Sequence, residues 1–527
     1  MFPPSNQRPS GPRDGPVPPP PPPALPSPLG APRAEPAPQS PPEGFPEQFQ
    51  TPDREGPANL RSIVPPPVRA AIAWLVIIVS MSIWIAASAI GQSAMKAAAE
   101  LEGQNVVSMQ SELQGRLMHS ITSFAKEHEG DGESKGGSSG LPAWAMKDAA
   151  PPPGASWIDR LAYALLLADA IDPDAGLAEL QKNPAARVYI VNDATSDQNF
   201  VDDQGLYDAV HSRLIAWRDD APRAPLDAAH AERLGWYAEL LKGRAPPSSI
   251  AFILLGYGAL FMLFGLAGVV LLVIGLVLAL TGSLRSRMTM TPYSHIYAET
   301  FALWFVLFAG LNVLIGIVLP VLDAEKFVML AAAIAMFGSL AVLAWPVVCG
   351  IPWKTVRQHV GLHAGKGIVQ EMLLGVPTYA CGLPLMFLGL CVFFVIRTLS
   401  PGAPPSHPIT DQLVGGPLQL VVIFFLACVA APIVEEVAFR GLLYRHLRDY
   451  GRVIGAVASG LLAIGVTSFL FAAIHPQGLA FVPVLGGLAT AFCLAREWRD
   501  SLLASIVAHG LNNAVTLSLG ILLLGGY

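Results

Sequence analysis

The chain has 527 residues, of which 52% are hydrophobic and only 14% are charged, and its mean hydropathy is +0.48. Soluble globular domains carry about 25% charged residues, so this composition excludes an ordinary soluble protein and predicts a polytopic membrane protein. The net charge of -6 is mild and no Lys/Arg-rich run is present, which excludes the usual signature of a nucleic-acid partner.

The amino-terminal part of the chain begins with a segment dominated by proline, residues 1–66, whose composition predicts a disordered tail. The first apolar run, Val68 to Ile90, starts too late for a secretory signal and is long enough to span a bilayer. We therefore expect residues 67–91 to form an uncleaved transmembrane anchor helix.

A polar segment follows, because hydrophobicity falls between residues 92 and 248 and acids outnumber bases there. Two stretches in it, Trp157 to Ala170 and Ala228 to Leu241, have helical periodicity. We expect a soluble, acidic and mostly helical insert outside the membrane. No motif in it carries recognisable chemistry, so its role stays open.

Eight further apolar runs bring the expected number of membrane helices to about nine. They lie at about 250–281, 299–322, 327–350, 368–396, 415–439, 453–475, 478–495 and 501–525. The predicted fold class is an all-α, polytopic transmembrane helix bundle with a mostly helical extracytoplasmic insert. We expect residues 249–350 to hold transmembrane helices 2–4 and residues 351–527 to form the carboxyl-terminal core of the bundle.

Lysine and arginine in the short joints between runs predict the orientation. The basic joints lie at Arg285/Arg287, Lys354/Arg357/Lys366, Arg445/Arg448/Arg452 and Arg496/Arg499. They alternate with joints that are poor in base, which places the amino-terminal tail in the cytoplasm and residues 92–248 on the opposite side. We expect the chain in a cell membrane of the bacterial inner-membrane type.

Two adjacent carboxylates and an arginine stand at the end of one apolar run, in the sequence Pro432-Ile-Val-Glu435-Glu436-Val-Ala-Phe-Arg440. A charge at the centre of a bilayer costs at least ~2.5 kcal/mol, so such a group predicts a functional site. On a helix Glu436 and Arg440 are i and i+4 and form an ion pair, while Glu435 projects about 100° away and is free for other work.

Two more polar intrusions lie downstream in similarly apolar surroundings. His475 ends one run, in Phe-Ala-Ala-Ile-His, and His509 and Asn513 are i and i+4 in the last one. A turn near Gly451 to Gly455 would bring Glu436 and His475 to similar depth. His509 matches that depth if the hairpin protrudes into the cytoplasm or if the chain unwinds at Pro476-Gln477-Gly478, and the sequence leaves both open.

The chemistry that suits these groups is hydrolysis of a peptide bond. Glu435 would deprotonate water, His475 would position that water, and His509 with Asn513 would donate to the developing oxyanion. No serine or cysteine has a base at recognisable spacing, so water is the expected nucleophile.

A metal-dependent version of this reaction uses the same residues and stays open. Glu435, His475 and His509 would be ligands of a Zn2+ ion with water as the fourth ligand. The HExxH motif is absent. Its nearest relative, His359-Val-Gly-Leu-His363, lacks the glutamate and is expected to be a solvated pair at the membrane interface.

The order Glu-Glu-x-x-x-Arg, Phe-x-x-x-His and His-x-x-x-Asn, each in its own apolar helix, resembles the CPBP or ABI family of intramembrane endopeptidases, whose eukaryotic relatives are the type II CAAX prenyl proteases. The resemblance covers about residues 350–525, including the joint Val360 to Gly367. It implies that Glu435 activates water, that Glu436 and Arg440 support it, that His475 holds the water, and that His509 and Asn513 stabilise the oxyanion.

The substrate implied is a membrane protein or a lipidated, membrane-associated peptide, with the lipid bilayer as the surrounding partner. Whether that substrate is prenylated does not follow from the residues. The alternatives are a secondary transporter, or a non-catalytic scaffold or immunity protein that uses the same buried polar groups. Glu436 and Arg440 could also be a buried ion pair that fixes the register of neighbouring helices and has no catalytic role.

Overall fold

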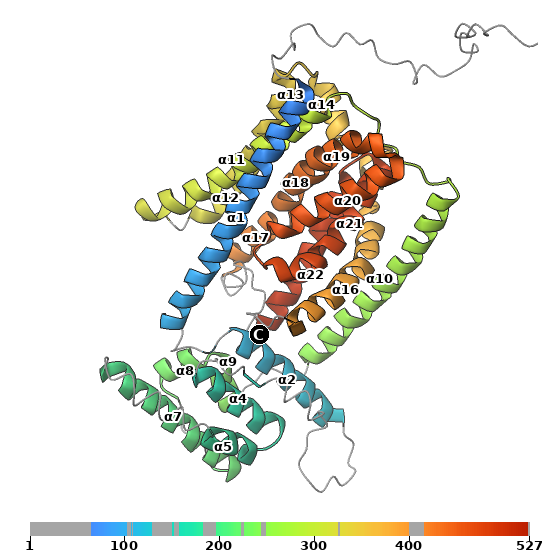
Figure 1. Cartoon of the computed structure of the whole chain (residues 1–527). Helices are drawn as coiled ribbons and strands as arrows, with labels where there is room; N and C mark the ends of the chain where they lie inside the picture. Colours follow the sequence, from blue (N-terminus) through green and yellow to red (C-terminus); the bar gives the residue numbers. More distant parts are fainter. Residues whose placement is uncertain are drawn as a thin grey trace, which may run out of the picture. The chain divides into compact units, whose positions relative to one another are not determined.

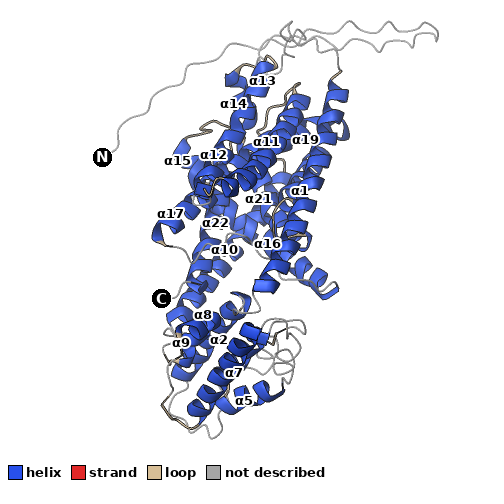
Figure 2. Ribbon diagram, turned by 90° about the vertical axis from the view of Figure 1, so that its left-hand side faces the viewer, coloured by secondary structure: helices blue, strands red, loops and turns tan. Residues whose placement is uncertain are grey.

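The computed structural model describes most of the chain outside its proline-rich beginning. The described residues are 65–102, 107, 109–128, 150–151, 157–182, 197–222, 226–243, 249–324, 327–399 and 416–524. The predicted disordered tail lies outside them, apart from its last two residues. Within these ranges every regular element is a helix and no strand occurs (Figure 2).

Among the described residues, nine helical segments are long and apolar enough to cross a membrane, which agrees with the nine predicted runs. They are Pro66–Gly91, Leu254–Leu280, Ser294–Val321, Val328–Val348, Ile368–Leu399, Pro417–Tyr450, Ala456–Ala473, Leu479–Arg499 and Leu503–Leu522. Large apolar side chains on them lie open to the surroundings, for example Leu263 at 63% and Val321 at 77% exposure. Such broad apolar surfaces are stable in lipid rather than in water, so the chain is an integral membrane protein.

The helices of the membrane part follow one another in the order seen in Figure 1. They are α1 (Pro66–Glu102), α10 (Ser249–Leu280), α11 (Ser294–Val321), α12 (Val328–Ser339), η5 (Leu340–Leu343), α13 (Ala344–Val348), α14 (Trp353–Val360), α15 (Ile368–Leu373), α16 (Gly375–Leu399), α17 (Pro417–Phe425), η7 (Leu426–Ala430), α18 (Ala431–Glu436), η8 (Val437–Leu443), α19 (Tyr444–Tyr450), η9 (Gly451–Ile454), α20 (Ala456–Ala473), η10 (Leu479–Phe481), α21 (Val482–Arg499) and α22 (Leu503–Leu524).

The segment predicted as an insert is helical where it is described. Its helices are α2 (Met109–His128), α4 (Trp157–Ala170), α5 (Pro173–Lys182), α7 (Asp197–Arg218), α8 (Ala228–Leu234) and α9 (Trp236–Leu241). They enclose an apolar core of their own, which includes Leu165, Leu206 and Trp236.

The predicted helix Ala228–Leu241 is interrupted. Asp227 caps its first half by accepting a hydrogen bond from the backbone N–H of His230 at 2.7 Å. Gly235, with φ of +54°, then separates α8 from α9. Because that backbone conformation favours glycine, the single predicted helix becomes two.

The turn predicted near Gly451 to Gly455 is present as η9, so the long segment Pro417–Tyr450 and α20 form a hairpin. At the other end α20 stops at Ala473, and the chain turns through His475 before η10 begins at Leu479. Of the two arrangements that the sequence left open, unwinding at residues 476–478 is therefore present. The chain packs α21 and α22 beside this hairpin, with α16 against both (Figure 1).

Candidate active site

Glu435, Glu436 and Arg440 lie on one continuous helical segment that contains two wide, π-helical turns, η7 and η8. Proline at 432 explains the first of them. It has no N–H to give to a preceding carbonyl, and its ring would collide with the carbonyl of Cys428 in a regular α-helix. Widening the turn relieves that collision, and such π-turns occur frequently at functional sites.

Asn513 of α22 donates a hydrogen bond to a backbone carbonyl of η7 that receives none from Pro432, because proline has no N–H. Its Nδ2 donates to the carbonyl of Ala427 in η7 at 2.7 Å, and its Oδ1 accepts from Asn512 Nδ2 at 3.2 Å. In a π-helical turn that Ala427 carbonyl would have accepted from residue 432. The asparagine therefore joins α22 to η7.

Glu436 is the centre of a fully buried polar cluster. Its Oε1 accepts from Arg440 Nη1 at 2.8 Å, and both side chains have 0% exposure, as the i, i+4 spacing predicted. The same oxygen lies 3.1 Å from His509 Nδ1. The Arg440 guanidinium is also 4.4 Å from the ring centre of Phe471 and 5.1 Å from that of Phe492, so aromatic faces complete its surroundings.

Glu435 points to a different set of groups, as its position on the helix predicted. Its Oε2 lies 3.9 Å from His475 Nε2 and 3.8 Å from His509 Nε2, and this buried oxygen has no hydrogen-bond partner within the protein. These separations are too long for direct hydrogen bonds. They are short enough for one water molecule to bind a carboxylate oxygen and an imidazole nitrogen together.

The second nitrogen of each imidazole has a separate partner. His475 Nδ1 lies 2.6 Å from the carbonyl of Phe471, whose ring also packs on the imidazole at 4.6 Å. A carbonyl only accepts, so His475 Nδ1 carries the proton, and the carboxylate of Glu436 assigns the same to His509 Nδ1. Both Nε2 atoms are thereby directed towards Glu435.

The structure thus brings five of the six predicted residues into one cluster in which successive partners are 2.8 to 3.9 Å apart: Arg440, Glu436, His509, Glu435 and His475. Asn513 is in the same helix as His509 but contacts η7 and Asn512. Its second amide hydrogen has no partner assigned by these two bonds, so a donor role at the site stays a prediction.

The distances between the predicted zinc ligands bear on the metal-dependent reaction. Three ligands of a tetrahedral zinc ion at about 2.0–2.2 Å from the metal lie roughly 3.3–3.5 Å from one another. Glu435 Oε2 is 3.8 and 3.9 Å from the two Nε2 atoms. Within the described part of the chain no three His, Cys, Asp or Glu side chains are arranged to hold a metal ion. The three donor atoms are therefore spaced more widely than the ligands of a zinc ion. Zinc binding at these residues stays a prediction.

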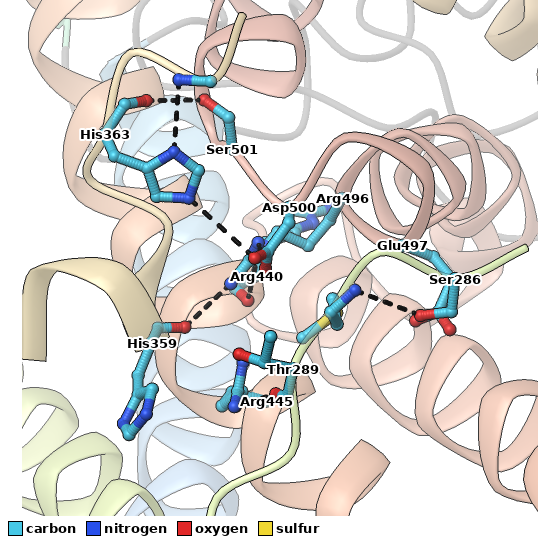
Figure 3. A network of polar contacts seen from close by, with 12 residues as sticks. Ser286, Thr289, His359, His363, Arg440, Arg445, Arg496, Glu497, Asp500 and Ser501 are labelled. Carbon is cyan, nitrogen blue, oxygen red and sulfur yellow. Dashed lines mark hydrogen bonds and ion pairs between the residues drawn. The ribbon is translucent and has the colours of Figure 1, made fainter. Parts of the chain in front are cut away.

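A network of buried arginines beside the site was not foreseen from the sequence (Figure 3). Arg445 and Arg496 are both 0% exposed. Arg496 pairs with Asp500 at 2.7 Å and donates to the carbonyl of His359 at 2.8 Å, while Arg445 pairs with Asp449 at 2.9 Å and donates to the carbonyl of Thr289. The sequence analysis used these arginines only for sidedness. Their acidic partners lie at i, i+4 spacing and could have been read from the pattern, whereas their bonds to the distant carbonyls of His359 and Thr289 could not.

The two histidines of the joint before the core make separate contacts. His359 is partly buried and its Nδ1 lies 2.7 Å from Tyr297 Oη, whereas His363 Nε2 lies 4.0 Å from Asp500 Oδ2 (Figure 3). The expectation of a solvated pair is therefore wrong for His359. Its tyrosine partner comes from a helix about 60 residues away in the chain, which local spacing does not reveal.

Comparisons with known proteins point to the same segment. Residues 417–515 match the family model described as type II CAAX prenyl endopeptidase Rce1-like. Over 139 residues the chain is 26% identical to the membrane-embedded CAAX protease MroQ of Staphylococcus aureus (strain USA300). The aligned residues make up 26% of this chain and 55% of MroQ. The chain therefore matches about half the length of this relative. No solved structure matches the chain.

The family match runs from the start of α17 into α22, and all six residues of the predicted motif fall within it. The order and spacing of these six residues pointed to the CAAX protease family, and the family model, which compares the whole segment, matches the same helices. Through these helices the chain is similar to the type II CAAX prenyl endopeptidases and to a membrane-embedded CAAX protease.

Proposed function

We propose that this chain is an intramembrane endopeptidase of the CAAX protease type, which hydrolyses a peptide bond of a membrane-associated protein or peptide with water activated by Glu435. One observation carries the proposal. A buried carboxylate oxygen without a hydrogen-bond partner faces the Nε2 atoms of His475 and His509 at 3.9 and 3.8 Å. Such a group is costly to bury unless it has a use.

In the proposed reaction Glu435 is the general base. A water molecule bound between Glu435 and His475 gives one proton to the carboxylate as its oxygen attacks the carbonyl carbon of the substrate. The protonated Glu435 then passes that proton to the amide nitrogen as the carbon–nitrogen bond breaks. The products are a carboxylic acid and an amine, so one water molecule is consumed for each bond cut.

His509 is the proposed stabiliser of the oxyanion. Glu436 accepts from its Nδ1 and so holds the ring with Nε2 towards Glu435, and in the proposed reaction this edge of the ring donates to the oxyanion as it forms. Arg440 forms the ion pair that balances the charge of Glu436. The unassigned amide hydrogen of Asn513 is the second proposed donor.

The membrane setting supports a substrate that is itself membrane-associated. The site residues lie on helices whose outer faces are apolar, so a substrate peptide reaches them most easily from within or beside the bilayer. We further propose a cell membrane of the bacterial inner-membrane type, with the tail in the cytoplasm and residues 92–248 on the other side.

The test is comparative proteomics of membranes from cells that carry the native chain, Glu435→Gln or His475→Ala. A peptide whose truncation requires both side chains supports the proposal and identifies the substrate. A transporter, scaffold or immunity function predicts identical termini in all three samples, with the cellular phenotype retained in the Glu435→Gln strain.

A further inference from the structure

The anchor helix α1 lies outside the segment that matches the protease family, yet it contacts the turn that carries His475. Trp84 Nε1 donates a hydrogen bond to the carbonyl of Ile474 at 3.2 Å. Ile474 directly precedes His475 and is the C-cap residue that follows α20. One hydrogen bond therefore joins α1 to the peptide unit from which the His475 side chain extends.

The Ile474 carbonyl needs a partner from outside its own helix. The last carbonyls of an α-helix have no intrahelical donor, and Gly478, whose N–H would bond the Ile474 carbonyl in a continuing helix, lies outside α20. The backbone bonds into this turn are long, at 3.4 Å for Ile474 N to Leu470 O and 3.3 Å for His475 N to Ala472 O. The hydrogen bond from Trp84 therefore contributes to the position of the Ile474–His475 turn, whose own backbone bonds are long.

Trp84 is itself held firmly. Its ring packs against Phe305 at 6.2 Å and Phe308 at 6.0 Å between centroids, both from α11. Further along α1, Arg69 forms a bidentate pair with Glu299 of α11, both bonds being 2.6 Å. Since α1 is fixed to α11 at two heights, the indole N–H is a rigid donor rather than a mobile one (Figure 1).

A second indole of α1 makes a comparable bond that does not reach the site. Trp74 Nε1 donates to His446 Nε2 at 3.0 Å, in α19, and His446 is not one of the candidate catalytic groups. The two tryptophans have the same chemistry, lie on the same helix and are bonded to the same long hairpin. They differ in whether the bond ends at the His475 turn.

We infer that Trp84 is a positioning residue for His475, which holds the imidazole at the distance from Glu435 that water activation requires. The catalytic consequence rests on the proposed function, whereas the structural consequence does not. Loss of the indole N–H leaves the Ile474 peptide free to tilt, and His475 Nε2 then departs from Glu435. The anchor helix α1, which precedes the polar insert in the chain, thereby becomes part of the active-site structure.

The test compares Trp84→Phe with Trp74→Phe in the full chain in lipid nanodiscs. Each variant removes one indole donor and keeps an aromatic ring, so general loosening of α1 affects both. The first readout is the rate at which diethyl pyrocarbonate modifies His475, followed by mass spectrometry. The second is kcat and KM for a peptide whose truncation depends on Glu435.

We expect Trp84→Phe to raise the modification rate of His475 roughly 2- to 10-fold, the factor that corresponds to one hydrogen bond. We expect kcat to fall about 10-fold or more with KM within about twofold, because the reacting groups are misplaced while substrate binding is not. Trp74→Phe should leave both readouts near the native values.

Equal effects of the two variants, or native values for Trp84→Phe, would overturn the positioning role. If Glu435→Gln does not stop any cleavage, the proposed function fails, and the modification rate alone still decides the role of Trp84. If either tryptophan variant does not fold, Trp84→Leu and Trp74→Leu replace the pair, because leucine keeps an apolar side chain and has no hydrogen-bond donor.

Discussion

At the scale of single residues, Glu436 is the group on which the other polar side chains of the site depend. Its Oε1 is shared by Arg440 at 2.8 Å and by His509 Nδ1 at 3.1 Å, and it is fully buried. It therefore balances one cation and orients one imidazole. In Glu435, its neighbour in sequence, the unpartnered Oε2 lies 3.9 and 3.8 Å from the Nε2 atoms of His475 and His509, which is why Glu435 is the proposed base.

Removing Arg440 should destabilise the folded chain strongly. Arg440→Met leaves Glu436 charged and buried with only His509 beside it, and we expect a loss of about 3–5 kcal/mol in the free energy of unfolding. The double variant Glu436→Gln/Arg440→Met should recover part of this loss, because no unpaired charge remains. Thermal unfolding in nanodiscs measures both. A single variant as stable as the native chain would contradict a tightly coupled pair.

Metal removal gives a second prediction at this scale. Because the Glu435, His475 and His509 donor atoms are spaced more widely than zinc ligands, we expect cleavage to survive dialysis against a strong chelator. The measurement is the cleavage rate before and after dialysis, with metal content determined in parallel. Loss of activity on dialysis and its recovery with Zn2+ alone would instead establish the zinc version of the site.

At the scale of elements, the approach of α22 to η7 is what brings His509 and Asn513 to the glutamates. Gly510 makes that approach possible, since a Cβ there would lie 2.6 Å from the carbonyl oxygen of Cys428. Asn513 then reaches the Ala427 carbonyl one turn further along. A proline, a wide turn and a glycine, none of them catalytic, together determine where the catalytic candidates lie.

Gly510→Ala should therefore push α22 away from η7. We expect a fall of at least about 10-fold in cleavage rate and a loss of roughly 1–3 kcal/mol in stability. Gly465→Ala in α20 is the matched control, because no atom lies within 4 Å of its added Cβ and alanine favours the helix by about 1 kcal/mol. Similar effects of the two changes would argue against a close contact at 510.

The joint helix α14 provides a prediction on pH. Burial, with the charges of Arg445 and Arg496 adding to it, lowers the pKa of His359 to about 4. Below pH 6.5 the unfolded chain binds a proton at this residue and the folded chain does not, so stability falls as the pH drops from 6.5 towards 4. His359→Gln should remove on the order of 1 kcal/mol of the difference in unfolding free energy between pH 7 and pH 5. An unchanged difference would contradict a neutral His359.

At the scale of the whole molecule, the sequence alone could predict what depends on composition and local spacing. The nine apolar runs, the Glu436–Arg440 pair and the turn at Gly451 to Gly455 are all confirmed. Each follows from a physical preference acting within a few residues of the chain.

Contacts between distant segments could not be predicted in the same way. The bond between Asn513 and Ala427 joins residues 86 positions apart. The bond from Arg496 to the His359 carbonyl joins residues 137 positions apart, and the bond from Trp84 to Ile474 joins residues 390 positions apart. Nothing in the local pattern selects one such partner over another. The sidedness of the membrane helices and the role of residues 92–248 stay predictions.

The central claim is that Glu435 activates the water that cuts the peptide bond, and the most direct measurement is the cleavage rate of the purified chain in nanodiscs with Glu435 replaced by Gln. The change keeps the shape of the side chain and removes its ability to take a proton. We expect the rate to fall by about 10²–10⁴-fold with unfolding temperature and substrate binding retained. A Glu435→Gln variant that cuts within about tenfold of the native rate would contradict the account.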